Sequence, residues 1–331
     1  MSKPVAVVWP YRFQRFTGSS WEVMMQQIVN ALLQHGFEVQ QHPQFISDLQ
    51  GTSTYKGQRK CDIVIYNHAV LPEVHKGDVI KAGAYWFMKP TGPTQAHFTL
   101  DTLGYGPYSS ISLTEPPFEL EDMFDAASFF DTTVSKWIAD NTSKWGKIFD
   151  LSPVAEDNFY LLVGQTFRDY TTRSMYFGSY IEALERAAEY LNSIDKLPVV
   201  IKLHPRVEEE HRVKLLQRFR AIIPRVSVYS GVQSIHSFLP KCRAVLLCNS
   251  TAGFEAMMHK KPIISFGHPE YHWISYDLRY LCDLDRAINL SWFNEQASCK
   301  YLYWYMTRYC CYDQQTTATR VKELLNVSTT K

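Results

Sequence analysis

Short apolar runs alternate with amphipathic segments along most of this chain. The runs are rich in Val, Ile and Leu and are typical of buried strands, whereas the intervening segments carry apolar residues at helical spacing. In the segment 20–34 these positions are Val23, Met24, Ile28, Ala31 and Leu32. Strands that alternate with helices pair in parallel, so the pattern predicts an α/β protein.

The first half contains a β–α–β opening followed by two more strands. We expect strands over residues 4–9, 37–41, 61–69 and 84–90 and a helix over 20–34. The pair His35-Gly36 is a stop signal for that helix. Residues 90–117 are rich in Pro and Gly and predict irregular structure.

A second α/β series begins near residue 158. It predicts strands over 158–165, 197–205 and 225–230, and helices over 174–193, 207–222 and 235–239. The series ends in residues 245–266, VLLCNSTAGFEAMMHKKPIISF, which read as a strand, a loop, a short helix and another strand.

A chain of 331 residues with 46% hydrophobic content is long for one domain and sufficient for two cores. We expect Rossmann-like domains over 1–155 and 156–300, with a ligand cleft between their carboxyl-end loops. Residues 301–331 are expected to form helices that close the molecule. One alternative is that these helices cross back to the first domain.

Composition excludes several classes of partner. Lys plus Arg (34) balance Asp plus Glu (33), which argues against nucleic acid. No stretch approaches the roughly 20 apolar residues of a membrane span, and the first residues lack the pattern of a signal sequence. We therefore expect a cytoplasmic protein. Association with the inner face of the membrane is the alternative. Seven cysteines without CxxC spacing argue against a zinc site or a disulfide framework. The aromatic segment 301–312 favours core packing over a binding surface.

Conspicuous polar residues follow four strands of the second half. They are Gln165, Arg168 and Asp169 after the first strand, Lys202, His204 and Arg206 at the second, Ser230 and Gly231 after the third, and Asn249, Ser250 and Thr251 after the fourth. Because the carboxyl ends of parallel strands share one edge of the sheet, these residues are expected to converge on one crevice. The basic members suit a diphosphate, although a helix-capping His204 and a solvated Lys202 and Arg206 are the alternative.

The helix that follows Asn249 predicts a nucleotide site. Free backbone N–H groups at Thr251, Ala252 and Gly253 would favour an anion such as phosphate, and Glu255 lies one turn further on, near enough for sugar hydroxyls. The alternative is that Asn249 or Ser250 only caps the helix and Glu255 is only a favourable first-turn charge.

Three motifs in this order resemble a known enzyme family. GQTFRD, KLHPR and NSTAGFEA, followed by KPIISFGHPEY, resemble the retaining β-Kdo glycosyltransferases of capsule, O-antigen and lipopolysaccharide synthesis, which transfer 3-deoxy-D-manno-oct-2-ulosonic acid (Kdo) from CMP-Kdo. The stretch HFTLDTLGYGPYSS (97–110) looks like a divergent version of a glycine-punctuated loop of that family.

The resemblance implies a GT-B-like fold in which the first domain faces the saccharide acceptor and the second binds CMP. It implies that His204 contacts the donor phosphate or the reacting sugar, that Ser250 and Thr251 bind phosphate, and that Glu255 binds the ribose. It also implies that Asp169 is the catalytic nucleophile, with a salt bridge to Arg168 or Arg173 as the alternative.

Retention at an anomeric carbon is most simply achieved by two inversions, which require a carboxylate nucleophile and a second acid/base group. Asp101 in the 97–110 loop is the candidate for that second group. Its alternative role is a turn or cap residue before Thr102, Leu103 and Gly104.

No metal or other cofactor is expected, because basic strand-end groups can neutralise the leaving CMP. The letters DLD at 283–285 fall outside the converging strand ends. The chain is interpreted as a free-standing transferase or one module of a larger synthase. The alternatives are a glycerophosphotransferase that uses CDP-glycerol and a non-catalytic scaffold that binds nucleotide sugars.

Overall fold

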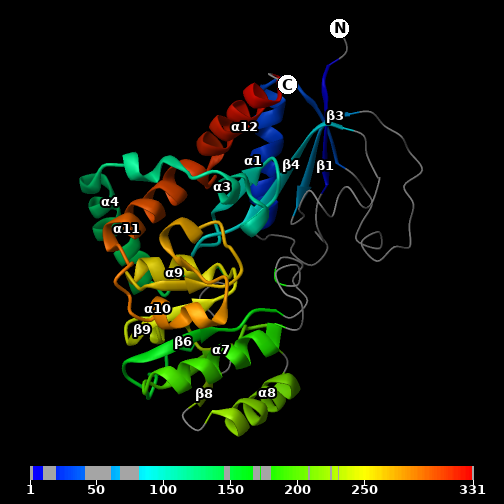
Figure 1. Cartoon of the computed structure of the whole chain (residues 1–331). Coiled ribbons are helices and arrows are strands. Elements are labelled where there is room, and N and C mark those ends of the chain that lie inside the picture. Colours follow the sequence, from blue (N-terminus) through cyan, green and yellow to red (C-terminus); the bar gives the residue numbers. More distant parts are fainter. Residues whose placement is uncertain are drawn as a thin grey trace. The chain divides into compact units, whose positions relative to one another are not determined.

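Two compact units make up the chain in a computed structural model (Figure 1). The first unit comprises Met1–Thr114 together with Tyr305–Lys331, and the second comprises Glu115–Trp304. The structure describes residues 3–9, 20–41, 61–67, 82–144, 150–166, 172, 180–207, 209–223, 226–229 and 231–329.

The first unit is built on a five-stranded sheet of order β2-β1-β3-β4-β5. Its strands are β1 (Val5–Trp9), β2 (Glu38–Gln41), β3 (Cys61–Asn67), β4 (Ala82–Pro90) and β5 (Phe98–Asp101). The first four pair in parallel, and β5 is antiparallel to β4. The four strands that the pattern predicted are therefore present.

Helices α1 (Ser20–Gln34) and α12 (Gln314–Thr329) lie side by side on this unit (Figure 1). Met24 and Ile28 of α1 pack with Ile63 of β3 and Leu324 of α12 in one apolar cluster. Val23, which the pattern assigned to the apolar face, is 59% exposed. Val23 lies at the margin of that face. Met24 and Ile28 can therefore be buried while the Val23 side chain stays exposed.

Gly36 ends α1 as the sequence predicts. The N–H of Phe37 bonds the Leu32 carbonyl at 3.1 Å, and that of Gly36 bonds the Leu33 carbonyl at 3.0 Å, which together form a Schellman motif. Gly36 has φ +82°, a left-handed conformation that glycine adopts without a Cβ penalty.

The segment 90–117 is more ordered than its composition suggested. It contains β5, the 3-10 turn η3 (Gly106–Tyr108) and α3 (Ser110–Leu113), and the 3-10 turn η4 (Pro117–Leu120) begins at its last residue. All four residues of β5 are buried, and Phe98 also exchanges backbone hydrogen bonds with Cys311. The strand has only four residues, and its contact with Cys311 is distant in sequence, so periodicity did not indicate it.

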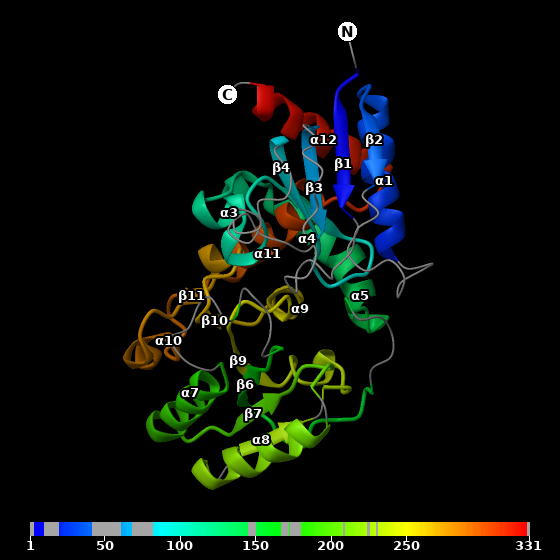
Figure 2. The same ribbon diagram turned by 90° about the vertical axis from the view of Figure 1, so that its right-hand side faces the viewer.

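The second unit contains a six-stranded parallel sheet of order β11-β10-β9-β6-β7-β8. Its strands are β6 (Phe159–Val163), β7 (Val199–Lys202), β8 (Val226–Tyr229), β9 (Cys242–Leu247), β10 (Ile263–Ser265) and β11 (Tyr276–Asp277). The longer helices between them are α7 (Tyr180–Ile194), which lies next to β7 (Figure 2), and α8 (Glu209–Ile222), which lies next to β8 (Figure 1). This confirms the predicted α/β class.

Shorter helices complete the second unit. They are α4 (Met123–Phe129), the π-helical turn η5 (Phe130–Val134), α5 (Ser135–Ala139), η6 (Ile235–Ser237), α9 (Ala252–Met258), η7 (His272–Ile274), η8 (Leu281–Asp283), α10 (Leu284–Ala287) and α11 (Glu295–Trp304). The contacts divide the chain at residue 114 and not near residue 155, because η4 and α4 pack against α11.

The aromatic segment 301–312 is used for packing. Tyr301 and Trp304 are buried in the second unit, and Tyr305 and Tyr309, from the π-helical turn η9 (Tyr305–Tyr309), are buried in the first. The preference for core packing is therefore confirmed. Among the described residues, no helix is both long and apolar enough to cross a membrane.

The buried His236 and the half-buried His259 join η6 to the end of α9. The Nε2 of His236 lies 2.9 Å from the Thr142 carbonyl and must donate to it, so its Nδ1 accepts from Nε2 of His259 at 2.8 Å. Burial lowers the pKa of both rings, to about 3 for His259. Both rings are therefore neutral at pH 7.

Acidification is predicted to destabilise the protein through this pair. The pKa values of both histidines in the folded protein lie below the ordinary value of about 6.5. The stabilisation from the neutral pair is therefore fully present above pH 6.5 and is lost as the pH is lowered further. Between pH 7.5 and pH 5 the free energy of unfolding of the parent is expected to fall, and roughly 2 kcal/mol of that fall should be absent from His259→Gln. Urea unfolding at each pH measures the difference. His35→Gln, at an exposed histidine, is the control and should leave the pH profile of the parent unchanged. A His259→Gln profile identical to the parent profile would contradict the assignment.

Candidate functional site

The parallel register of the second sheet places the loops after β6, β7, β8 and β9 at one edge. The predicted residues that lie there are Gln165, Lys202, His204, Arg206, Gly231, Asn249, Ser250, Thr251, Gly253 and Glu255. The remaining predicted residues of this unit, Arg168, Asp169 and Ser230, lie outside the described residues.

Gln165 and Asn249 tie the β6 loop to the β9 loop. The Nε2 of Gln165 donates to Oδ1 of Asn249 at 2.8 Å, and its Oε1 accepts from the Asn249 backbone N–H at 3.0 Å. Gln165 is buried and its amide also lies 3.3 Å from Oγ1 of Thr172. Both ends of the Gln165 amide are therefore used for positioning the neighbouring loop.

Lys202 crosses from the end of β7 toward the β8 loop. Its Nζ donates to the Gly231 carbonyl at 3.2 Å and is buried, which lowers its pKa to about 8, while the charge of Glu255 opposes that shift. The ammonium is thus held at the strand ends with little access to water. A buried cation of this kind interacts strongly with any anion that enters the site.

Glu255 is the counterpart of Lys202 on α9. Burial raises its pKa to about 7, against the lowering effect of Lys144 and Lys202. In the described part of the chain, its Oε2 has no hydrogen-bond partner, and neither has the buried Nδ2 of Asn249. One acceptor and one donor are therefore available for hydroxyl or phosphate groups of a ligand.

The start of α9 differs from the expectation of free N–H groups. Oγ of Ser250 accepts from the Ala252 N–H at 3.2 Å, and the Ser250 carbonyl accepts from the Gly253 N–H at 3.1 Å. Two of the three groups are therefore occupied, because the chain enters this short helix through a tight turn. Ser250 therefore closes a turn ahead of the helix, whereas the N-cap position is Thr251, whose side chain makes no capping hydrogen bond.

His204 is held by its own loop. Its Nδ1 accepts from the Arg206 backbone N–H at 3.1 Å, which fixes Nδ1 as the unprotonated nitrogen of the neutral ring. Gly231 packs against this loop so closely that a Cβ would overlap the His204 carbonyl and the Pro205 backbone. The β7 and β8 loops are therefore in direct contact.

Asp101 lies in the first unit and is fully buried. Its carboxylate accepts from the N–H groups of Leu103 (2.7 Å) and Ser110 (3.0 Å), and from the hydroxyls of Ser110 (2.5 Å) and Tyr309 (2.6 Å). Both oxygens are used, which is the geometry of a structural anchor. The contacts support the turn-capping alternative for Asp101, and its acid/base role stays a prediction.

The loop after β10 supplies residues to which sequence analysis gave no role. The Tyr271 hydroxyl donates to the Ser250 carbonyl, and its ring lies where a Cβ on Gly253 would be. His268 has φ +44° and bonds Asp277 through Nδ1 at 2.8 Å. The motif FGHPEY was the available signal, because a Gly and a Pro flank His268 at a tight turn.

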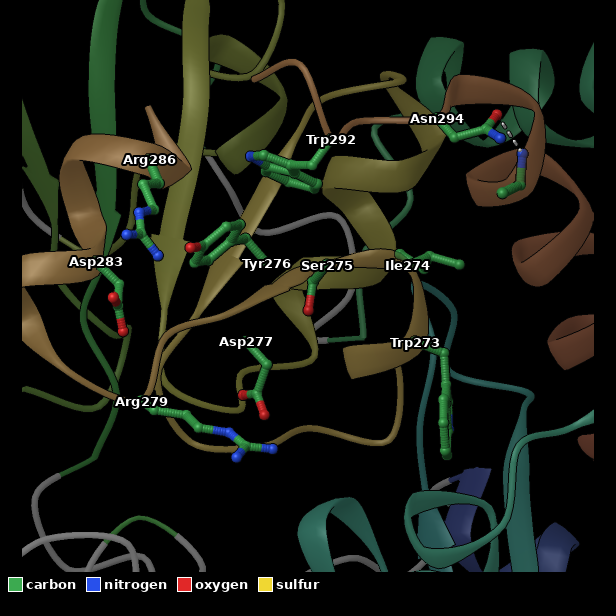
Figure 3. Close-up of a pocket in the computed structure, with 11 residues that line it drawn as sticks. Trp273, Ile274, Ser275, Tyr276, Asp277, Arg279, Asp283, Arg286, Trp292 and Asn294 are labelled. Atoms are coloured by element: carbon green, nitrogen blue, oxygen red, sulfur yellow. Dashed lines mark hydrogen bonds between the residues drawn. The ribbon is translucent and has the colours of Figure 1, made fainter. Parts of the chain in front are cut away.

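A cavity of about 440 Å³ opens beside β11, and none of the predicted site residues lines it (Figure 3). Asp283 of the DLD sequence contributes to its wall, whereas Asp285 does not. In the part of the chain that the structure describes, no three His, Cys, Asp or Glu side chains are arranged to hold a metal ion.

Gly231→Ala is predicted to destabilise the protein by about 1–3 kcal/mol, because the new methyl group would meet backbone atoms that cannot move aside cheaply. Gly164→Ala is the matched control at the same edge, since its Cβ would lie 3.3 Å from its nearest neighbours and should cost less. Urea unfolding of both variants measures the difference. Equal stability of Gly231→Ala and the parent would show that the two loops are not packed as described.

Glu255→Gln is predicted to become progressively more stable than the parent as the pH rises. The pKa of Glu255 is about 7 in the folded protein and 4.5 ordinarily. As the pH rises through this range, the folded parent loses on the order of 3 kcal/mol of stability, because ionised Glu255 is disfavoured in the buried site. Glutamine does not ionise and avoids this loss. Unfolding free energies at pH 5 and pH 8 measure this. Glu189→Gln, at an exposed glutamate of α7, should show no such trend. A constant difference between Glu255→Gln and the parent would exclude a buried, desolvated carboxylate.

Comparison with solved structures defines the fold. Over 98% of both chains, the protein matches the KpsC β-Kdo 2,4 transferase of Thermosulfurimonas dismutans with a TM-score of 0.56 and 15% identity. The KpsC β-Kdo 2,7 transferase of the same organism matches over 97% of this chain and 99% of its own, with a TM-score of 0.51 and 14% identity. The two Rossmann-like units thus have the GT-B-like fold that the resemblance implied.

No curated protein matches the sequence of this chain. The family model described as "Capsule polysaccharide biosynthesis protein" matches residues 126–312. This match covers more than half of the chain and includes the whole strand-end site, and the chain therefore belongs to the capsule polysaccharide biosynthesis protein family.

Proposed function

We propose that the chain is a retaining glycosyltransferase that moves Kdo from CMP-Kdo to a saccharide acceptor in capsule synthesis. The observation that carries the proposal is the buried pair Lys202 and Glu255 at the strand ends, with an unsatisfied carboxylate oxygen, inside the segment that matches the family. The fold is that of two structures described as β-Kdo transferases, which supports the choice of sugar.

The donor nucleotide would bind at the strand-end edge of the second unit. Lys202 would lie near the phosphate, because its desolvated ammonium gains most from a fixed negative charge. Glu255 would accept hydrogen bonds from ribose hydroxyls through Oε2, and the Asn249 amide would donate through Nδ2. Gln165 would hold Asn249 in place.

Binding of CMP adds a negative charge to a site whose carboxylate has a pKa near 7. A neutral Glu255 would donate as well as accept, and Lys202 would retain its proton beside the phosphate. The proposed roles of His204, Ser250 and Thr251 at the phosphate or the reacting sugar come from the motifs that they occupy. Arg168, Arg206, Ser230, Gly231 and Gly253 belong to the same proposed donor site.

The reaction would proceed by two displacements. In the first, the Asp169 carboxylate attacks C2 of Kdo and the bond from C2 to the phosphate oxygen breaks, so that CMP leaves with the electron pair. In the second, the acceptor oxygen attacks C2, the aspartyl ester bond breaks, and the proton of the acceptor hydroxyl passes to a base. Asp101 was the candidate for that base, although its saturated hydrogen bonding favours an anchoring role.

No metal or cofactor is part of this proposal, since Lys202 and its basic neighbours would neutralise the leaving phosphate. The protein would act in the cytoplasm or at the inner face of the membrane, on a saccharide or glycolipid acceptor, and no nucleic acid partner is proposed.

Incubation with CMP-Kdo followed by intact-protein mass spectrometry tests the proposal. The expected result is an increase by one Kdo residue, mapped by peptide analysis to Asp169. Asp169→Asn should abolish transfer and adduct while leaving CMP affinity within about threefold, and His204→Ala should reduce both transfer and CMP affinity. Transfer should persist in EDTA.

Three results would contradict this proposal. Consumption of CDP-glycerol without use of CMP-Kdo would indicate a glycerophosphotransferase. Tight binding of CMP-Kdo without turnover would indicate a scaffold. Full activity of Asp169→Asn would exclude Asp169 as the nucleophile.

A further inference from the structure

The cavity beside β11 is lined by groups that the donor site does not use. It lies at the edge of the sheet opposite α8 and β8. Its wall combines three aromatic side chains, two arginines and two aspartates from three successive segments of the second unit. These are Trp273, Tyr276, Asp277, Arg279, Asp283, Arg286 and Trp292.

The aromatic wall is fixed in position. The Tyr276 and Trp292 rings pack at a centroid distance of 5.6 Å, and Nε1 of Trp292 donates to the Ala287 carbonyl at 2.8 Å. Trp273 packs on His272 at 4.2 Å. Rigid aromatic faces of this kind suit the apolar C–H face of a sugar ring, because they contribute area at little cost in conformational entropy.

The charged groups of the cavity differ in how they are used. The Oδ2 atom of Asp277 is hydrogen-bonded to Nδ1 of His268 at 2.8 Å. Within the described residues, neither Arg279 nor Arg286 forms an ion pair, and Figure 3 shows Arg286 beside Tyr276 and Arg279 beside Asp277. Two exposed guanidinium groups that form no ion pair in the described part of the chain are suited to bidentate binding of a carboxylate.

The size of the cavity limits the ligand. A volume of about 440 Å³ is in the range of small-molecule sites and fits one or two sugar rings. Asp283 adds an acceptor for hydroxyl groups, which a site for a simple anion would not need.

We propose that this cavity is a saccharide subsite that binds a carboxylate-bearing sugar, with Arg279 and Arg286 holding the carboxylate and the aromatic wall holding the ring. The proposal rests on the proposed function for the source of that sugar, which is a residue of the acceptor chain. The subsite would retain the growing saccharide on the unit that also binds the donor. It contributes no group to the displacement steps.

Saturation-transfer NMR titrations of the full chain with digalacturonate and with maltose test the subsite, because both are α-1,4-linked disaccharides and only the first carries carboxylates. Digalacturonate is expected to bind at least tenfold more tightly than maltose. The double variant Arg279→Gln/Arg286→Gln should remove that preference, and Trp273→Ala should weaken both ligands. Arg220→Gln, at an exposed arginine of α8 outside the cavity, is the control and should bind as the parent does.

The proposal is overturned if digalacturonate shows no binding, if maltose binds equally well, or if Arg220→Gln loses as much affinity as the double variant. The Kdo adduct is measured separately on the same proteins. The double variant should form it as readily as the parent, since its substitutions lie outside the donor site. Absence of the adduct from the parent with intact digalacturonate binding would reject the transferase and leave the subsite standing.

Discussion

Parallel pairing in the second sheet is the constraint on which the site depends. Each strand of a parallel sheet must return through a crossover, so the loops that leave the strands share one edge. The contacts from Gln165 to Asn249 and from Lys202 to Gly231 join loops that lie 84 and 29 residues apart along the chain. Residues distant in sequence thus become neighbours without any local signal at their own positions.

Burial gives these neighbours their chemical character. In water Lys202 and Glu255 would carry full opposite charges at pH 7, but desolvation moves their pKa values toward one another, to about 8 and about 7. Taking both charges out of water costs stability, and the unsatisfied Oε2 of Glu255 adds to that cost. Such a cost is consistent with a site that is completed by a polar ligand, because the ligand supplies the missing hydrogen bonds.

The sequence was a good guide to elements whose pattern is local. The helix 20–34 and its Gly36 stop were predicted to the residue, and strands β6 to β10 of the second half were predicted in order, whereas the two-residue strand β11 was not predicted. It was a poor guide where tertiary contacts decide. The strand β5 depends on its partners, the Ser250 turn occupies N–H groups that were expected to be free, and the donors around Asp101 come from as far away as Tyr309. The arginines beside β11 carried no motif, and only the fold places them together.

The position of CMP in a crystal of the complex tests the central claim most directly. The account predicts the phosphate near Lys202 and the ribose hydroxyls within hydrogen-bond distance of Glu255, with the missing sugar directed toward Asp169. CMP bound in the cavity beside β11, or on another face of the second unit away from the ends of β6, β7 and β9, would contradict it.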